Sequence, residues 1–192
     1  MKPWRTLVLT SLTSVALLVP TQAYAGSYLV HDSTKDVISQ TDDGAETKAP
    51  DHTEGDVRSS YVEYAPRRVV AAMSYVGLTQ TPDLAGHVFS FHTNKGRVRD
   101  VTVLAGPGHW AGRAEMTTGR GRHVRCRVAR TIDYTQHRIS ISVPRSCLGK
   151  PRWVQVGMGM VTVKGNTFFG DDALTNGTLG NNVVLGPRVF RG

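Results

Sequence analysis

The sequence predicts an all-β protein whose main part folds as an antiparallel β-sandwich with one disulfide. Short segments of alternating apolar and polar residues recur along the chain, separated by glycine, proline and asparagine. The clearest is 138–143, where Ile139, Ile141 and Val143 alternate with polar residues. No segment of useful length has the period of an amphipathic helix. Many short strands of this kind are typical of sandwiches and barrels.

The strands are expected from residue 57 onward. Ala65-Pro66 predicts a turn between two antiparallel strands, and the polar residues 93–96 predict another. Pro144 ends the strand that contains Ile139. In chain order the expected strands are residues 58–64, 67–76, 87–92, 97–104, 113–117, 123–129, 138–143 and 153–163.

Two glycines mark the segment 153–163. Gly157 and Gly159 lie on the same face of this predicted strand as Trp153. Alternating glycines leave a flat floor that suits a planar ligand, or they let another backbone approach closely. A bend or crossing of the sheet is the alternative, and we favour it because strand glycines are so often structural.

The first 25 residues have the pattern of a secretory signal peptide. Lys2 and Arg5 precede the uncharged stretch 6–20, and Ala23-Tyr24-Ala25 fits a cleavage site. The apolar stretch is shorter than the roughly 20 residues that span a membrane, and no later stretch is long enough. We therefore expect a secreted protein, extracellular or associated with the cell wall, with no membrane span.

Charge divides the remaining chain into two parts. Residues 26–56 form an acidic leader, and the polar stretch 40–56 predicts that this leader is partly mobile. Residues 57–192 form the predicted β-sandwich domain and are strongly basic, so that the whole chain has a formal net charge of +8. The two parts could pair with each other within the molecule, or their charges could simply be solvated, which is the usual fate of a run of charges.

The chain contains two cysteines, Cys126 and Cys147. This number excludes a disulfide-dense miniprotein and a zinc cluster built on cysteines. Outside the cytosol such a pair is normally oxidised. The spacing is not C-x-x-C, which argues against a redox-active pair. We expect a structural disulfide.

Three short motifs carry a resemblance: Gly55-Asp56-Val57, the segment Val143–Gly149 (VPRSCLG), and Trp153-Val154. They resemble exported, mostly uncharacterised β-sandwich proteins of high-GC Gram-positive bacteria, which are loosely similar to carbohydrate-binding and DOMON-like modules. The resemblance covers most of the mature chain loosely and the segment around Cys147 closely. It implies a jelly-roll-like sandwich that binds sugars, haem or no known ligand.

Arginines form the most distinctive cluster of the sequence. On the predicted strand 123–129, His123, Arg125 and Arg127 share one face, and Arg138 on the next strand can join them. Such a stripe could hold a cell-wall polysaccharide or another anionic polymer, although a solvated sheet face is the alternative. Trp110 is a candidate binding aromatic. Poor aromatic interleaving argues against nucleic acid as the partner.

Aspartates supply hard oxygen ligands of the kind that Ca²⁺ takes. The sequence has no EF-hand spacing, and solvated turn residues are the alternative. The resemblance to sandwich modules implies that a bound calcium would be structural. The candidate ligands are Asp32, Asp36, Asp56, Asp171 and Asp172, with Asp51 in the same acidic stretch.

These observations together predict a non-catalytic, extracellular module that binds a carbohydrate or an anionic cell-wall polymer. The histidines form neither H-x-x-x-H nor H-E-x-x-H, and G-x-S-x-G does not occur. No catalytic residue is therefore predicted, and calcium is the one candidate cofactor. The alternatives are an extracellular hydrolase whose site assembles only in the fold, and a protein-interaction or inhibitor domain that presents the loop 106–112.

Overall fold

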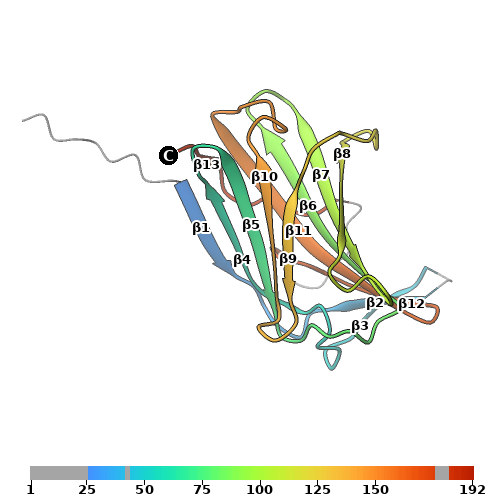
Figure 1. Cartoon of the computed structure of the whole chain (residues 1–192). Helices are drawn as coiled ribbons and strands as arrows, with labels where there is room; N and C mark the ends of the chain where they lie inside the picture. Colours follow the sequence, from blue (N-terminus) through green and yellow to red (C-terminus); the bar gives the residue numbers. More distant parts are fainter. Residues whose placement is uncertain (1–25, 42–43, 176–181) are drawn as a thin grey trace, which may run out of the picture.

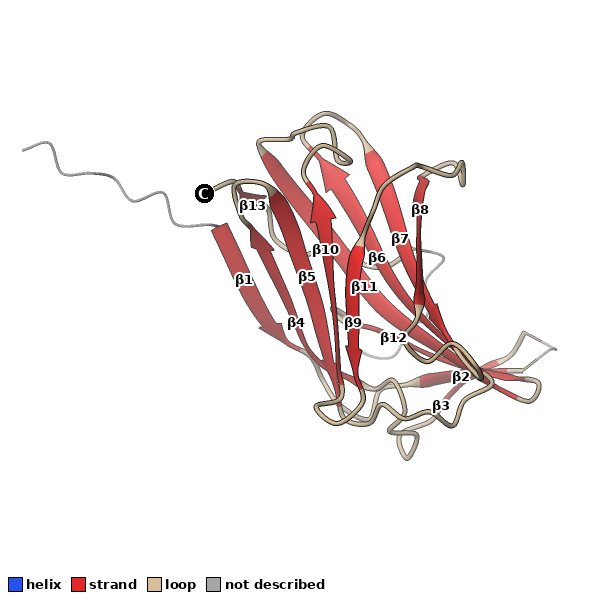
Figure 2. Ribbon diagram, viewed as in Figure 1, coloured by secondary structure: helices blue, strands red, loops and turns tan. Residues whose placement is uncertain are grey.

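The computed structural model describes residues 26–41, 44–175 and 182–192 of the 192-residue chain. The regular structure of these residues is β throughout, in two antiparallel sheets that pack against each other (Figure 2). The predicted fold class, an antiparallel β-sandwich with one disulfide, is confirmed. The predicted signal peptide, residues 1–25, lies outside the described residues.

In the described part of the chain, no helix is long and apolar enough to cross a membrane.

The smaller sheet has the spatial order β1-β4-β5-β10-β9. Its hairpin β4–β5 turns at the predicted position around Ala65 and Pro66. The strands are β1 (Gly26–His31), β4 (Val57–Tyr64), β5 (Arg68–Tyr75), β9 (Ala129–Asp133) and β10 (Arg138–Pro144).

The larger sheet has the order β3-β2-β12-β11-β6-β7-β8, and β13 also pairs with β11 (Figure 1). The long strands β11 and β6 lie side by side at its centre. The strands are β2 (Ile38–Gln40), β3 (Glu46–Lys48), β6 (Leu84–Thr93), β7 (Val98–Ala105), β8 (Arg113–Thr118), β11 (Trp153–Lys164), β12 (Thr167–Asp172) and β13 (Val189–Phe190).

The core lies between the sheets and is filled by the apolar face of each strand. Phe89 and Phe91 of β6 and Ile139 and Ile141 of β10 are buried, as the alternation of their segments predicts. Full burial of an aliphatic or aromatic side chain of this size stabilises the fold by roughly 1.5–3 kcal/mol. The face that each strand presents to the core is thus fixed by its period-two pattern.

The prediction of a strand at residues 123–129 is wrong. Residues 119–128 instead form a connection that crosses from β8, at the edge of the larger sheet, to β9, at the edge of the smaller one. Val124, Cys126 and Val128 still pack against the core, which explains the alternation in the sequence. A segment that passes from one sheet to the other has no neighbouring strand over most of its length, so it forms no ladder of its own.

Residues of the predicted acidic leader belong to both sheets. β1 pairs with β4 at one edge of the smaller sheet, while β2 and β3 extend the larger sheet beyond β12. Within the described residues, the sandwich therefore includes strands from Gly26 onward, ahead of the expected boundary at residue 57. These strands are short or half exposed, so no run of alternating apolar residues marks them in the sequence.

Gly157 and Gly159 of β11 lie beneath the C-terminal segment 182–186. A Cβ atom on Gly157 would come within 2.7 Å of Val183 Cγ2 and 2.8 Å of the Val184 carbonyl oxygen, and one on Gly159 within 3.0 Å of Val183 Cγ1. The close approach of another backbone accounts for both glycines. The segment thereby occupies the space directly over these two glycines, while Gly159 also lines a hollow of about 680 Å³ beside the segment.

Candidate functional site

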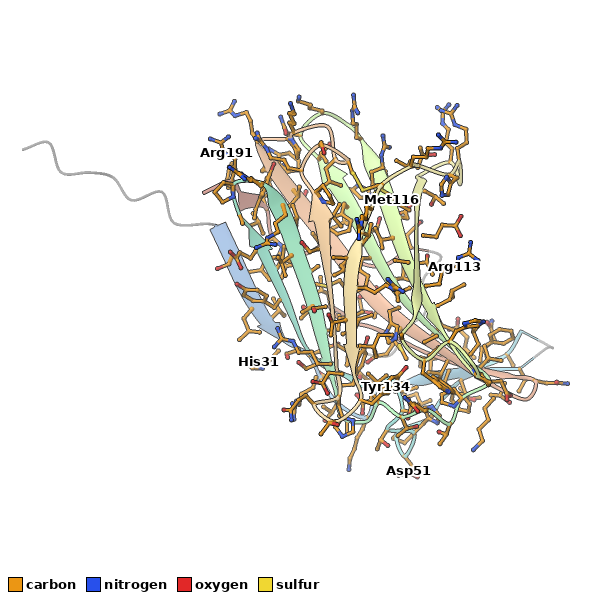
Figure 3. All side chains as sticks on the ribbon, in the orientation of Figure 1. His31, Asp51, Arg113, Met116, Tyr134 and Arg191 are labelled. Carbon is orange, nitrogen blue, oxygen red and sulfur yellow. A yellow bond between two sulfur atoms is a disulfide. The ribbon has the colours of Figure 1, made fainter. Side chains whose placement is uncertain are left out.

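Five stretches of chain meet at the upper end of the sandwich in Figure 1, because alternate connections of an antiparallel sheet lie at the same end. The stretches are 64–68, 93–98, 118–129, 144–153 and 186–192, and their sequences contain no Asp or Glu. We call this surface the basic end. Side chains tipped with nitrogen project from it near the labelled Arg191 (Figure 3). Its charged residues are Arg67, Arg68, Lys95, Arg97, Arg120, Arg122, Arg125, Arg127, Arg145, Lys150, Arg152, Arg188 and Arg191.

The segment 145–152 anchors two other loops of the basic end. Its Cys147 forms the predicted disulfide with Cys126 of the connection 119–128. The backbone N–H of Arg145 donates a hydrogen bond of 2.9 Å to the carbonyl oxygen of Arg67 in the β4–β5 turn. The arginines of three separate connections are thereby held at fixed positions relative to one another.

The β6–β7 turn is tied to the same segment. Lys95 Nζ donates a hydrogen bond of 2.9 Å to the carbonyl oxygen of Gly149, and the N–H of Arg152 donates one of 2.8 Å to Asn94 Oδ1. These contacts order the loops before any ligand arrives. Less conformational entropy is then lost on binding than with free loops.

Arginines line two depressions in the basic end. One has a volume of about 580 Å³ and includes Arg67, Arg68 and Arg127. The other has a volume of about 430 Å³ and is lined by arginines at positions 97, 99, 120 and 122. Guanidinium groups form paired hydrogen bonds with carboxylate, sulfate and phosphate groups. Each depression therefore offers positions for the charged groups of an anionic ligand.

The structure separates the residues predicted to form one stripe. His123, Arg125 and Arg127 are exposed in the connection 119–128 rather than on a strand, and Arg127 lines the first depression. Arg138 begins β10 and borders a small hollow with Tyr61 on the outer face of the smaller sheet. The predicted stripe on one sheet face therefore does not form.

Trp110 lies away from the basic end, in the loop 106–112 that joins β7 to β8. Its ring packs edge-on against Tyr134, with 6.1 Å between centroids, and the Tyr134 hydroxyl donates to the Trp110 carbonyl oxygen at 2.9 Å. It borders a depression of about 600 Å³ together with His109 and Arg113. Trp110 and Arg125 consequently belong to opposite ends of the molecule.

Arg67, Arg68 and Arg97 are residues of the basic end that the sequence interpretation missed. Each lies beside a turn that the sequence predicts, around Ala65-Pro66 or within 93–96. Local patterns show that the chain reverses there, but they do not show which turns share an end of the sandwich. The available signal was the recurrence of basic residues at every second connection between the predicted strands.

Three of the predicted calcium ligands come together at the opposite end, which we call the acidic end. Asp36 lies between β1 and β2, Asp56 immediately precedes β4, and Asp171 is on β12. One ligand atom from each carboxylate lies within 4.8 Å of the corresponding atoms of the other two. Asp56 and Asp171 are buried and Asp36 is half-buried. We call these three residues the aspartate cluster.

Local backbone geometry directs these side chains toward one another. Lys35 and Gly55 adopt left-handed conformations, with φ angles of 69° and 80°, directly before Asp36 and Asp56. Glycine takes this conformation readily, whereas for lysine it is uncommon. Asp171 follows the alternation of β12 and points between the sheets, where the N–H of Val57 in the smaller sheet donates to its Oδ2 at 2.7 Å.

The oxygens of the aspartate cluster lack a full set of hydrogen bonds. The N–H of Lys35 donates to Asp56 Oδ2 at 2.9 Å, but Asp56 Oδ1 and both oxygens of Asp36 are buried without a hydrogen-bond partner. Burial and repulsion from neighbouring carboxylates raise the pKa of Asp171 to about 8. Burial also raises the pKa values of Asp36 and Asp56. The arrangement favours bound protons or a bound cation over three bare negative charges.

Two further predicted ligands lie near this cluster but outside it. Burial, followed by repulsion from Asp36, raises the pKa of Asp32 to about 7, and its Oδ2 is buried without a partner. Asp172 faces the other side of β12, where its two oxygens accept the N–H groups of Leu174 and Val184 at 3.0 and 2.7 Å. Asp51 is exposed at the acidic end (Figure 3).

Comparison with protein-family models, with curated proteins and with solved structures gives no match for this chain. Its function is therefore argued from the chemistry of the basic end and the aspartate cluster.

Proposed function

We propose that this protein is a secreted, non-catalytic module that binds an anionic polysaccharide, such as one of the cell wall, through its basic end. The observation that carries the proposal is the gathering of arginines and lysines from five stretches of chain at one end of the sandwich, in sequences free of Asp and Glu. A surface with only positive charges attracts polyanions over a long range and holds them at short range.

The chemistry of arginine supports a ligand with carboxylate, sulfate or phosphate groups. A guanidinium group presents several N–H donors in a fixed plane, so it pairs with such groups through two hydrogen bonds at once. Arg67, Arg68 and Arg127 converge on one depression from two different connections. Because the disulfide and the Arg145 hydrogen bond already order these connections, a polymer can bind across them without first ordering the loops.

The aromatic residues favour a polysaccharide over a nucleic acid. Single-stranded nucleic acids are held by a row of aromatic side chains on which bases stack. At the basic end, the Arg188 guanidinium lies 4.5 Å from the centroid of the Trp153 ring and covers it. Phe190 is exposed there, but one ring does not form a row. Binding through charged groups along a polymer matches this surface better than stacking.

The proposal predicts that the arginines of the first depression, Arg67, Arg68 and Arg127, contact the polymer directly. Binding should therefore depend on these positions and not only on the net charge of the protein. The variant Arg67→Gln with Arg127→Gln removes two charges from the depression, and we expect at least a tenfold weaker affinity for heparin and for purified anionic wall polysaccharide. Affinity is measured by titration at several salt concentrations, because each lost ion contact also reduces the salt dependence.

The matched control is Arg113→Gln with Arg138→Gln, which removes the same charge from exposed positions away from the basic end. It should retain near-normal affinity. Equal losses in both double variants would show that net charge alone attracts the polymer and would overturn the proposed site. Tighter binding of single-stranded DNA than of any polysaccharide would overturn the choice of ligand.

A further inference from the structure

We propose that the aspartate cluster, Asp36, Asp56 and Asp171, is a calcium site that fastens the N-terminal part of the chain to the larger sheet. This inference is independent of the polysaccharide proposal, because the cluster and the basic end lie at opposite ends of the sandwich. It depends on the positions of these carboxylate oxygens and on what surrounds them.

The spacing of the carboxylates fits one shared cation. Ca²⁺ binds oxygen at roughly 2.3–2.6 Å, so two oxygens on the same ion are separated by at most about 5 Å. The ligand atoms of Asp36, Asp56 and Asp171 all lie within 4.8 Å of one another. Three carboxylates can therefore reach one ion with little movement, and water or carbonyl oxygens can complete its coordination.

Asp56 gives a second, independent indication of a ligand. Asp56 is fully buried, with 0% of its surface exposed, yet its Oδ1 atom has no hydrogen-bond partner. The other oxygen, Oδ2, accepts the N–H of Lys35 at 2.9 Å, which orients the carboxylate and leaves Oδ1 available to a ligand. A fully buried oxygen of this kind is strongly unfavourable unless it is protonated, paired or bound to a metal.

The other two carboxylates follow the same pattern. Asp171 Oδ2 accepts the N–H of Val57, which fixes that carboxylate from the facing sheet. Both oxygens of Asp36 are buried and have no hydrogen-bond partner, so no lysine or arginine of the described residues donates to them. Lys35, which directly precedes Asp36, donates its backbone N–H to Asp56 and keeps its side chain exposed.

The donor atoms select a hard cation. All three ligands are carboxylates, which suit calcium better than zinc, because zinc sites in proteins are built largely from histidine and cysteine. The neighbouring His52 is held elsewhere, with its ring stacked on Phe169 at 3.8 Å between centroids. Calcium also accepts irregular coordination, which three carboxylates from separate loops can provide.

A bound ion would connect three parts of the fold. Asp36 belongs to the connection between β1 and β2, Asp56 to the approach to β4, and Asp171 to β12. The ion would replace repulsion between these carboxylates by attraction. It would thereby fix the place where the chain passes from the smaller sheet to the larger one.

The test is calcium binding by chelator-treated protein near pH 7.5, followed by titration calorimetry and by terbium luminescence with Ca²⁺ as competitor. We expect one saturable site per chain and a rise of several degrees in the melting temperature with Ca²⁺. Asp56→Asn and Asp171→Asn should each weaken binding at least tenfold. Asp51→Asn, an exposed change of the same kind at the same end, should leave binding unchanged.

Folding of each variant is checked by circular dichroism in chelator, where loss of a like charge should not destabilise the cluster. Asp36→Asn, at a half-buried position, provides a third variant if either buried one fails to fold. Absence of saturable binding up to millimolar Ca²⁺, or equal binding by wild type and the folded cluster variants, overturns the site. Heparin affinity of Asp56→Asn should equal that of the wild type, so failure here is separate from failure of the polysaccharide proposal.

Discussion

His87 is a fully buried imidazole near the centre of the larger sheet. Its Nδ1 is 2.8 Å from the hydroxyl of Tyr75, and its Nε2 is buried without a hydrogen-bond partner. Burial lowers the pKa of His87 from 6.5 to about 3. The residue is therefore neutral in the folded protein over a pH range in which an unfolded chain would protonate it.

This difference makes stability depend on pH. Between pH 6.5 and about 3 the unfolded state binds a proton at this position and the folded state does not, so stability falls as the pH decreases. The contribution is about 1.4 kcal/mol per pH unit. We expect His87→Gln to remove that part of the slope when the free energy of unfolding in urea is measured at several pH values from 4 to 6.

The control for this prediction is His92→Gln, a histidine change at a half-exposed position of the same strand. This variant shows how the slope of the unfolding free energy against pH changes when a histidine that is not fully buried is lost. If wild type and His87→Gln show the same slope against pH, His87 is not neutral in the folded state as described.

Single residues also show where sequence reasoning about the site succeeds and where it stops. The sequence predicts Asp36, Asp56 and Asp171 as calcium ligands because they carry carboxylate oxygens, and the structure places them together. Asp172 was selected on the same grounds, but adjacent residues of a strand point to opposite faces, so only one of the pair can enter the cluster. Calcium binding itself stays a prediction until it is measured.

At the scale of elements, the residue types on each face of β11 match what packs against that face. Its inner face carries large apolar residues, while its outer face carries Gly157 and Gly159 beneath Val183. Overpacking at such a contact typically costs 1–3 kcal/mol. We expect Gly157→Ala to lower the free energy of unfolding by about 2 kcal/mol, as measured by urea denaturation.

Gly86→Ala provides the comparison in the neighbouring strand β6. A Cβ atom there would meet Leu104 Cδ2 at 3.5 Å, an ordinary contact, so the change should be tolerated. Equal stability of Gly157→Ala and Gly86→Ala would mean that the segment 182–186 does not press on β11.

The same scale explains which strands the sequence reveals. β4 to β8, β10 and β11 have a buried and a more exposed face, so alternation marks them. β2 and β3 have three residues each, too few for a period to appear. β12 contains Gly170 and two aspartates, which are rare in strands, and its pairing with β11 depends on tertiary contacts.

At the scale of the whole molecule, the disulfide joins the connection 119–128, which crosses between the sheets, to the segment 145–152 of the basic end. Cys126 and Cys147 are separated by 21 positions, and closing a loop of this size stabilises a fold by about 3 kcal/mol in the chain-entropy model. We expect Cys126→Ser with Cys147→Ser to lower the free energy of unfolding by about that amount and to weaken heparin binding, because the connection 119–128 is released.

Urea denaturation and heparin titration of this double variant check the two effects separately. Wild-type protein treated with reductant should behave like the variant, whereas oxidised wild type should not. Unchanged heparin affinity in a folded double variant would show that the disulfide does not position Arg125 and Arg127 for binding.

The sequence indicates a basic domain preceded by acidic residues, but it does not indicate that the two charges occupy opposite ends. That separation arises because β1 runs beside β4 and carries the acidic residues that follow it to the end opposite Arg67. The arrangement follows from strand order, which depends on contacts distant along the chain. Local patterns therefore predict the strands far better than the surface they assemble.

The separation of charge also gives the molecule a direction. A body that is positive at one end and negative at the other turns in the field of a negatively charged layer before it touches that layer. The basic end would lead, and the end that holds Asp36, Asp56 and Asp171 would be turned toward the surrounding medium. A bound module would then be displayed with a single outward face, on which dissolved ions can still exchange.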